Sequence, residues 1–373
     1  MWGYWKMLSM PNHRLDPTAP VGQTGRSRWR NPWLWFGWLA GLLTLLWVLR
    51  DFEVEQLRTI LATADYRFLL VLPLLVVIEQ LIRAFKWRQF LFALRPVGVW
   101  RLFGAIMVGY LCNLVVPVRV SPLVRAWLVA RLEGMRVGTV LASIALDRIV
   151  DGFVFVAITL AALAFVVFPD ETGAVREGLV WGGAGSLAIF SALVVGLLYL
   201  RRRGSRGTVL PEFLMRRLPG RLARPIDAFA VLFAEGIVVP REAWRRVMIV
   251  AASIAVKVMA TLHFVFAGLA FGLLLAPMEY VFAMVFLGFM IILTGMLRIV
   301  GGFTVGAVFV LGGFGVEVET ALAMAIIVQA ASLLTLAVTG AAALWAEGIS
   351  LGDLRAQGAE LTSQKIIDKT ENA

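Results

Sequence analysis

The chain has 373 residues, of which 60% are apolar and only 16% are charged, and its formal net charge is +11. A soluble domain is nearer half apolar and a quarter charged, so this composition excludes an ordinary water-soluble protein. The basic residues gather in short loops between apolar runs, which sets orientation in a membrane and does not indicate nucleic-acid binding. The single cysteine, Cys112, excludes an intramolecular disulfide.

The apolar runs are long enough to cross a bilayer as helices, which takes about 20 residues for a core about 30 Å thick. They lack the strict alternation of barrel strands. Such runs include Trp33–Leu49, Val140–Phe168, Leu179–Leu200 and Val247–Ala276. We therefore predict an all-α fold: a polytopic integral membrane helical bundle with about 7–8 apolar helices.

Basic loops predict the orientation of these helices. The leader carries five basic residues before Trp33, which places the N-terminus in the cytoplasm. The second helix, from about Phe68, then returns to a basic segment on the cytoplasmic side. We divide the chain into a basic cytoplasmic leader (1–32), a transmembrane domain (33–346) with a basic cytoplasmic loop (201–245), and a polar C-terminal tail (347–373).

The basic loop creates a conflict, because three apolar runs separate it from Arg101 and three crossings would place it outside. The first of these runs, Leu102–Val118, ends in Asn113 and Pro117 and leads into further arginines. Irregular backbone is tolerated at membrane depth where protein buries it. We therefore predict a re-entrant hairpin from Arg101 to Arg131.

The second half of the chain shows a similar order. Val247–Ala276 is predicted to run outward, and Tyr280–Leu297 is predicted to return to Arg298. The glycine-rich stretch Gly301–Gly315 is too short to span, so we expect a second re-entrant element there. A last helix, about Ala321–Trp345, follows. A structural repeat of the transporter kind would fit this order, although the sequence shows no clear self-similarity.

Asp147, Arg148 and Asp151 form the sharpest polar cluster inside an apolar run. Ionisable groups at membrane depth mark a functional site by default. Asp147 and Asp151 share one helix face, and Arg148 lies three residues before Asp151, so each pair is able to meet. The alternative is a self-neutralised ion cluster that only locks helices together.

Arg119 and Arg125 lie beside the predicted hairpin, which Pro117 and Pro122 interrupt. Arginine binds phosphate with two parallel hydrogen bonds, so both residues are candidates for capturing a lipid head group. The alternative is simple anchoring by positive charge on the cytoplasmic side.

The end of the second helix carries Glu79, Arg83, Lys86, Trp87 and Arg88. Glu79 and Arg83 are spaced to pair on one helix face. Lys86, Trp87 and Arg88 are typical of an interfacial belt, and this structural interpretation is favoured over a functional one.

Lys257 and His263 lie in the long run that follows Arg246. Lys257 is a candidate partner for Asp147 or Asp151, whereas a buried histidine is more often packed and hydrogen-bonded. The chain has two histidines, no spacing typical of metal ligands and no phosphate-binding loop with its lysine, so we expect no cofactor and no metal.

Three segments resemble motifs of the flippase-like domain family, which includes the transmembrane region of bacterial lysylphosphatidylglycerol synthases. Residues 83–88 resemble its R-A-x-R-W-R signature. Residues 113–125 resemble its N-L-x-x-P-x-R-x-x-E-x-x-R hairpin, and Ala142–Asp151 is similar to its A-S-x-x-x-E-R-x-x-D helix, with Asp147 at the Glu position. The resemblance covers roughly 57–345.

Two departures from the family pattern bear on activity. Ser121 and Pro122 stand where the family hairpin has Gly-Glu, and the stretch Gly302–Ala307 lacks the usual proline and acid. The family's synthases also carry a cytosolic aminoacyl-transfer domain, whereas only a short tail follows Trp345 here. We therefore expect this chain not to make an aminoacylated lipid, and not to be an enzyme.

The resemblance and the polar clusters together predict a transporter that moves an amphiphilic, phosphate-bearing lipid between the leaflets of the cell (inner or plasma) membrane. Membrane lipids with anionic head groups are the expected partners. The alternatives are a membrane-embedded transferase subunit, or a non-catalytic membrane partner of enzymes that make lipids or envelope glycoconjugates. The candidate substrate-binding residues are Arg83, Arg88, Asn113, Arg119, Arg125, Asp147, Arg148, Asp151 and Lys257.

Overall fold

The computed structural model describes residues 59–60, 62–115, 121–169, 173–204, 230–297 and 301–346. Within these residues every regular element is a helix. The helices are α3 (Tyr66–Leu69), α4 (Val71–Leu91), α5 (Val99–Val115), α6 (Ser121–Glu133), α7 (Val137–Phe165), α8 (Ala174–Gly204), α11 (Ala243–Ala270), α12 (Pro277–Leu297), α13 (Gly302–Gly313) and α14 (Val318–Ala346). The predicted helix Trp33–Leu49 lies outside the described residues.

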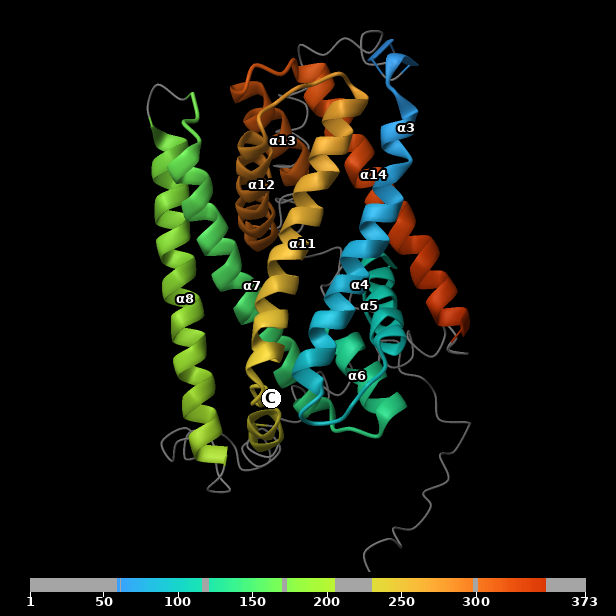
Figure 1. Cartoon of the computed structure of the whole chain (residues 1–373), viewed down its shortest axis with the longest axis vertical. Coiled ribbons are helices and arrows are strands. Elements are labelled where there is room, and N and C mark those ends of the chain that lie inside the picture. The colour runs from blue at the N-terminus through green and yellow to red at the C-terminus, as the bar shows by residue number, and fades with distance from the viewer. Residues whose placement is uncertain are drawn as a thin grey trace, which may run out of the picture.

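Six of the described segments are long and apolar enough to cross a membrane: α3 with α4, and then α7, α8, α11, α12 and α14. They run between two ends of an elongated bundle, called here the upper end, where α3 begins, and the lower end, where α4 ends (Figure 1). The prediction of an all-α polytopic membrane bundle is confirmed.

Helices α5 and α6 form a hairpin that begins and ends at the lower end of the bundle (Figure 1). The carboxylate of Glu133, at the end of α6, lies 2.7 Å from Arg101 Nη1 and 3.4 Å from Arg95 Nε, both near the start of α5. At the far end, Asn113 Oδ1 accepts a hydrogen bond from the Ser121 backbone N–H at 2.9 Å. This caps the first turn of α6, whose N–H groups have no partner within the helix.

Helices α12 and α13 form a second hairpin, at the upper end (Figure 1). Phe282 near the start of α12 and Phe314 just after α13 pack edge to face at 5.8 Å. Phe168, after the upper end of α7, stacks on Phe282 at 5.3 Å. Although α12 is long enough to span, the α12–α13 pair starts and finishes at the same end. The prediction that Tyr280–Leu297 crosses to the opposite side stays a prediction, because α12 is long and apolar enough to cross a membrane while α13 carries the chain back up (Figure 1).

The remaining helices alternate in direction. α7 runs up, α8 runs down, and α11 starts again at the lower end, where Arg245 Nη1 donates to Gln89 Oε1 of α4 at 2.8 Å. The segment between α8 and α11 therefore begins and ends at the same end as the connection from α4 to α5. This is the arrangement that the predicted hairpin requires of the basic loop (201–245).

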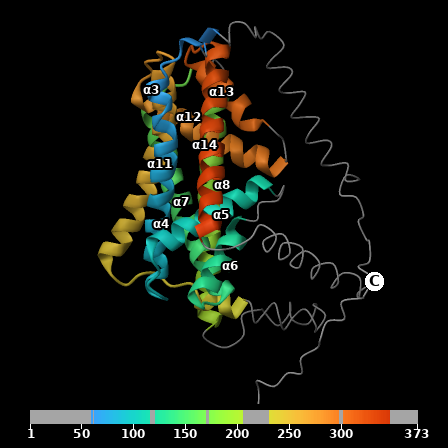
Figure 2. The same cartoon turned by 90° about the vertical axis from the view of Figure 1, so that its right-hand side faces the viewer.

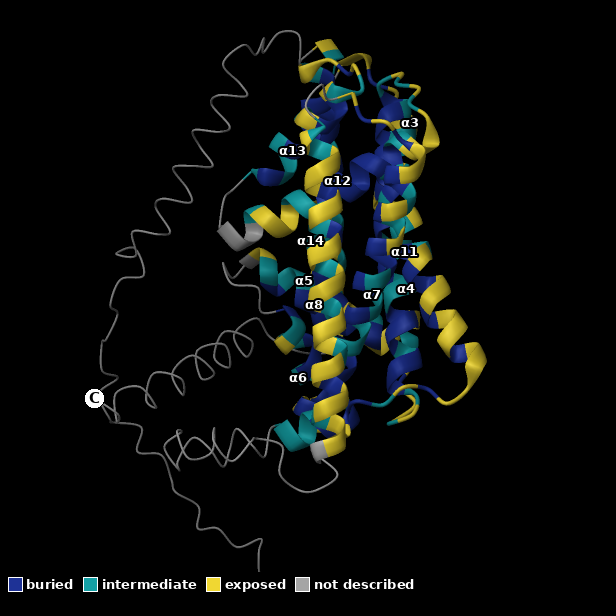
Figure 3. Cartoon of the chain, turned by 90° about the vertical axis from the view of Figure 1, so that its left-hand side faces the viewer, coloured by how far each residue is buried: buried dark blue, intermediate teal, exposed yellow. Residues whose placement is uncertain are grey.

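Three apolar clusters fill the described part of the bundle. An upper cluster joins α4, α7, α8, α11, α12, α13 and α14, and a lower cluster joins the end of α4 to α5, α6, the start of α7 and the end of α14. A small third cluster joins α7 to α8. Figure 2 shows α14 running down beside α4 and α5. By contrast, only 11% of the most apolar stretch of α8 is buried inside the protein. Exposed residues follow most of the length of this helix (Figure 3). In a membrane, that surface of α8 faces lipid or another protein.

Cysteine labelling in a Cys112→Ser background checks this arrangement in a membrane. Gly98→Cys and Arg136→Cys flank the α5–α6 hairpin, whereas Leu274→Cys and Glu317→Cys flank the α12–α13 hairpin; all four positions are exposed. We expect an impermeant maleimide to label the first two from one side of the membrane and the last two from the other. Labelling of positions 98 and 136 from opposite sides would show that α5 and α6 cross the bilayer.

Candidate functional site

One face of α4 carries three charged residues at the spacing i, i+4, i+7, and this face looks into the bundle. Arg83 donates to Glu79 Oε1 from Nη2 at 2.8 Å and from Nε at 3.1 Å. The predicted Glu79–Arg83 pair is therefore confirmed. The third residue, Lys86, is completely buried.

The ammonium of Lys86 lies between two carboxylates of α7. Its Nζ is 2.5 Å from Asp151 Oδ1 and 2.8 Å from Asp147 Oδ1. Arg83 Nη1 lies 3.8 Å from the other oxygen of Asp151. The prediction that Asp147 and Asp151 share one helix face is confirmed, because one cation meets both. We call Lys86, Asp147 and Asp151 the buried triad.

The interpretation of Lys86 and Trp87 as part of an interfacial belt is wrong. The Trp87 side chain is 3% exposed, and its Nε1 donates to Ser143 Oγ of α7 at 2.9 Å. Apolar packing around α4 and the carboxylates of α7 draw both side chains inward. Their contacts join α4 to α7 across the bundle.

A second group of basic side chains lies beside the triad, around Tyr110 of α5. The guanidinium of Arg125 stacks over the Tyr110 ring, 4.4 Å from its centroid. Arg83 and Arg148 also interact electrostatically with Tyr110. We call Arg83, Tyr110, Arg125 and Arg148 the arginine cluster.

Arg125 is held in place by close packing of α6 on α5. A Cβ added at Gly109 would lie 2.8 Å from Arg125 Cγ and 2.8 Å from Ser121 Oγ, so only glycine leaves room for this side chain. Arg125 is only 7% exposed, yet its Nε and Nη2 have no hydrogen-bond partner in the described part of the chain. Most buried polar groups are hydrogen-bonded, so these two donors point to a ligand.

The structure separates the other predicted site residues from one another. Arg148 is exposed and forms no ion pair with Asp151 among the described residues, since Lys86 and Arg83 take that place. Lys257 lies over the Phe155 ring, 5.0 Å from its centroid, and is not within ion-pair distance of a described carboxylate. Arg88 is half-buried, with no described partner for Nε.

The two remaining predicted residues belong to the hairpin. Asn113 caps α6, as described above, and so shapes the hairpin. Arg119 lies outside the described residues. His263 is packed as expected, with its Nδ1 2.7 Å from the Met259 carbonyl oxygen.

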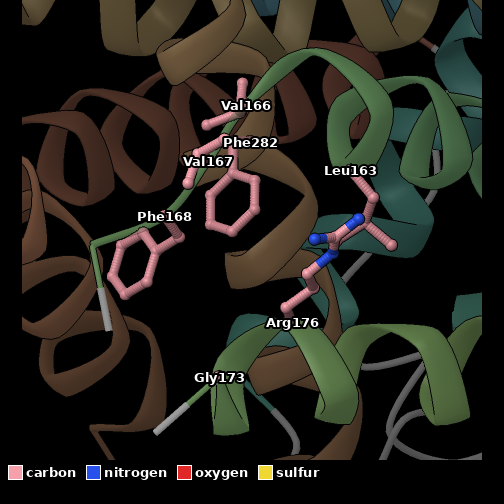
Figure 4. A pocket seen from close by; sticks show the side chains of 7 residues that line it. All are labelled: Leu163, Val166, Val167, Phe168, Gly173, Arg176 and Phe282. Carbon is pink, nitrogen blue, oxygen red and sulfur yellow. The ribbon is translucent and has the colours of Figure 1, made fainter. Parts of the chain in front are cut away.

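Two pockets, of about 170 and 370 Å³, lie at the upper end of the bundle, away from the charged groups. Figure 4 shows the smaller one, where Arg176 of α8 borders a wall formed mainly by Leu163, Val166, Val167, Phe168 and Phe282. Leu163 is 16 residues after Asp147 on α7, about 24 Å along the helix. These pockets are therefore separate from the candidate site.

Sequence reasoning missed Lys86 and Tyr110. The signal for Lys86 was its spacing from Glu79 and Arg83, which places all three residues on one helix face. No local pattern marks Tyr110, because its role comes from the way α6 packs on α5. The described residues contain no group of three or more side chains suited to hold a metal ion.

Comparison with known proteins gives one match. The family model of the lysylphosphatidylglycerol synthase TM region matches residues 34–340, most of the chain. No curated protein and no solved structure matches it. The matched range contains both hairpins, the buried triad and the arginine cluster, and the chain belongs to the family of the lysylphosphatidylglycerol synthase transmembrane region.

Proposed function

We propose that this protein is a transporter that moves an amphiphilic, phosphate-bearing lipid between membrane leaflets, with Arg125 holding the head group. The observation that carries this proposal is the buried guanidinium of Arg125, of which two nitrogens have no hydrogen-bond partner among the described residues. An unpaired buried donor costs about 1–3 kcal/mol, and more for a charged group. A bound anion that accepts both N–H groups removes this cost.

Phosphate is the anion that suits this site in a membrane protein. A guanidinium presents parallel N–H groups that match two phosphate oxygens, and charge-assisted bonds of this kind are roughly twice as strong as neutral ones. Arg83 and Arg148 add positive charge around Tyr110. Arg148 is exposed, and we assign it the first contact with an approaching head group.

The two hairpins support transport rather than static binding. The α5–α6 hairpin enters from the lower end and the α12–α13 hairpin from the upper end, and both reach toward the middle of the bundle (Figure 1). Transporters commonly build their sites from broken helices and expose them alternately to the two sides. In our proposal both hairpins are re-entrant in the membrane, and their movement opens the arginine cluster to one leaflet and then to the other.

The same proposal covers location and partners. The protein resides in the cell (inner or plasma) membrane with its N-terminus in the cytoplasm, and its partners are membrane lipids with anionic head groups. Asp147, Arg148 and Asp151 form the polar wall of the transport route. The proposal assigns no catalytic step to any of these residues.

Replacing Arg125 tests the proposal. We expect Arg125→Ala to lower translocation of a fluorescent phosphatidylglycerol in reconstituted vesicles by about tenfold or more, because one hydrogen bond to a charged group contributes about 1.5–3 kcal/mol and each 1.4 kcal/mol is tenfold. Arg125→Lys keeps the positive charge but loses the two parallel N–H groups of the guanidinium, so an intermediate translocation rate is expected. The rate is measured by quenching of the outer leaflet with dithionite.

Arg131→Ala is the matched control, because Arg131 lies on the same helix but is exposed and stacks on Trp127, 5.3 Å from its ring centroid. This variant should translocate at the wild-type rate. Equal rates for wild type, Arg125→Ala and Arg131→Ala would rule out head-group capture by Arg125. No translocation by the wild-type protein would reject the transporter itself.

A further inference from the structure

We propose that the carboxylate of Asp147 binds and releases one proton per transport cycle, so that lipid movement is coupled to a proton gradient. This inference rests on the proposed lipid transport and adds its energy source. Its basis is the buried triad, in which two carboxylates share one ammonium far from either end of α7.

The charges of the triad do not balance. Lys86 supplies one positive charge to two carboxylates, at 2.5 Å from Asp151 and 2.8 Å from Asp147. Two carboxylates that share a site disfavour ionisation of one of them, and burial adds to this effect. One proton at the triad therefore removes the excess negative charge.

The contacts of the two carboxylates favour protonation of Asp147 over protonation of Asp151. Asp151 accepts a hydrogen bond from Lys86 and also lies 3.8 Å from Arg83 Nη1, so its negative charge is well compensated. Asp147 Oδ1 lies 2.8 Å from Lys86 Nζ, but no second cation among the described residues is within ion-pair distance of this carboxylate. Asp147 is thus the less stabilised carboxylate of the pair.

Charged groups on the helices packed against this part of α7 also act on the two carboxylates. On α4 these are Glu79, Arg83 and Lys86, and on α11 Lys257, which interacts with Asp151. On α7 itself, Arg148 interacts with Asp147. On α6, Arg125 stacks over Tyr110 and interacts with Arg148. The charged residues of α8 and α12 lie only near the helix ends.

The position of Asp147 suits a transported proton. It lies ten residues after Val137, about 15 Å into a helix about 43 Å long, so protons must enter and leave from both directions. Its side chain is 19% exposed, whereas that of Lys86 is fully buried. In one conformation Asp147 takes a proton from water on one side, and in the other it returns that proton to water on the opposite side.

Coupling also lowers the electrostatic cost of transport. A head group with one negative charge, held by Arg125, crosses together with one proton on Asp147, so the lipid and proton carry no net charge across. Arg148 interacts with Asp147, with Tyr110 and with Arg125. An anion that draws Arg148 away from Asp147 strengthens proton binding there, and by linkage the proton strengthens anion binding.

Steady-state lipid asymmetry tests the coupling. Vesicles of phosphatidylcholine with a trace of fluorescent phosphatidylglycerol carry the full-length protein, the membrane potential is held at zero with valinomycin and potassium, and a pH difference of one unit is imposed. One proton per lipid is expected to sustain an asymmetry of up to about tenfold between leaflets. Protein-free vesicles and Arg125→Ala vesicles correct for passive redistribution.

The outcomes separate the two proposals. Equilibration to equal leaflets with and without the gradient would overturn the coupling and leave lipid transport standing. No equilibration in either condition would reject transport itself. Asp147→Asn is expected to abolish the sustained asymmetry, so that the two leaflets hold equal amounts of labelled lipid. An unchanged asymmetry in this variant would exclude Asp147 as the proton site.

Infrared spectroscopy tests the proton site without transport. The wild-type protein in detergent is expected to show the carbonyl band of a protonated carboxyl group that disappears as pH rises, and this band should be missing in Asp147→Asn. Asp151→Asn leaves Lys86 to balance Asp147 alone, so the band should persist only to a lower pH than in the wild type. Absence of such a band in the wild type would overturn the proposal even if neither variant folds.

Discussion

Lys86→Met is expected to destabilise the folded protein by about 3–5 kcal/mol. The change removes the ammonium from the buried triad and leaves Asp147 and Asp151 facing each other, and the loss of one partner of a buried ion pair costs about this much. Methionine keeps most of the volume, so the effect comes from charge. The midpoint of thermal unfolding in detergent, followed by tryptophan fluorescence, measures it.

Lys257→Met is the matched control for this prediction. Lys257 is also largely enclosed in the bundle, but it contacts the Phe155 ring and has no ion-pair partner within the described residues. Its replacement should change the midpoint far less. Adding Asp147→Asn and Asp151→Asn to Lys86→Met should restore much of the lost stability. A Lys86→Met protein as stable as wild type would show that the triad does not hold α4 to α7.

Gly340→Leu is expected to force α14 away from the α5–α6 hairpin. A Cβ at Gly340 would lie 2.9 Å from the Met107 carbonyl oxygen and 2.8 Å from Leu111 Cβ, so backbone must move. Overpacking of this kind costs typically about 1–3 kcal/mol, which exceeds the helix propensity of up to about 1 kcal/mol that leucine gains over glycine. We expect a lower unfolding midpoint together with slower lipid translocation.

Gly185→Leu provides the comparison. Gly185 lies on α8, and a Cβ there would meet nothing within 4 Å. Leucine should therefore be neutral or slightly stabilising at this position. If Gly340→Leu and Gly185→Leu have the same stability and translocation, the close approach of α14 to α5 does not matter for either property.

The helices were predictable from sequence because each reflects a local property. The run predicted as Val140–Phe168 is α7 (Val137–Phe165), and the run predicted as Leu179–Leu200 lies within α8 (Ala174–Gly204). Length against bilayer thickness decides that such runs are spans, and no long-range contact is needed. The same holds for Glu79 and Arg83, four residues apart on one helix.

The hairpins were only partly predictable. Charge on the basic loop (201–245) indicated that Leu102–Val118 turns back, and the Glu133 contacts with Arg95 and Arg101 place both hairpin ends together. For the second hairpin, the short glycine-rich stretch Gly301–Gly315 predicted the element that contains α13, but no charge pattern marked α12 as its other half. Tyr280–Leu297 satisfies the length of a full crossing, so its return through α13 depends on packing of Phe282 against Phe314.

The sequence by itself determined that this protein is a membrane helical bundle of its family and that Asp147 and Asp151 lie on one face. These properties follow from hydrophobic length and a period of 3.6 residues. Only the tertiary structure decided that Lys86, 65 residues from Asp151, joins them. Only the tertiary structure decided, too, that Arg125 is buried over Tyr110 with two donors that no described residue accepts. Such contacts join distant parts of the chain, and the energy of each depends on burial and distance, which local sequence does not encode.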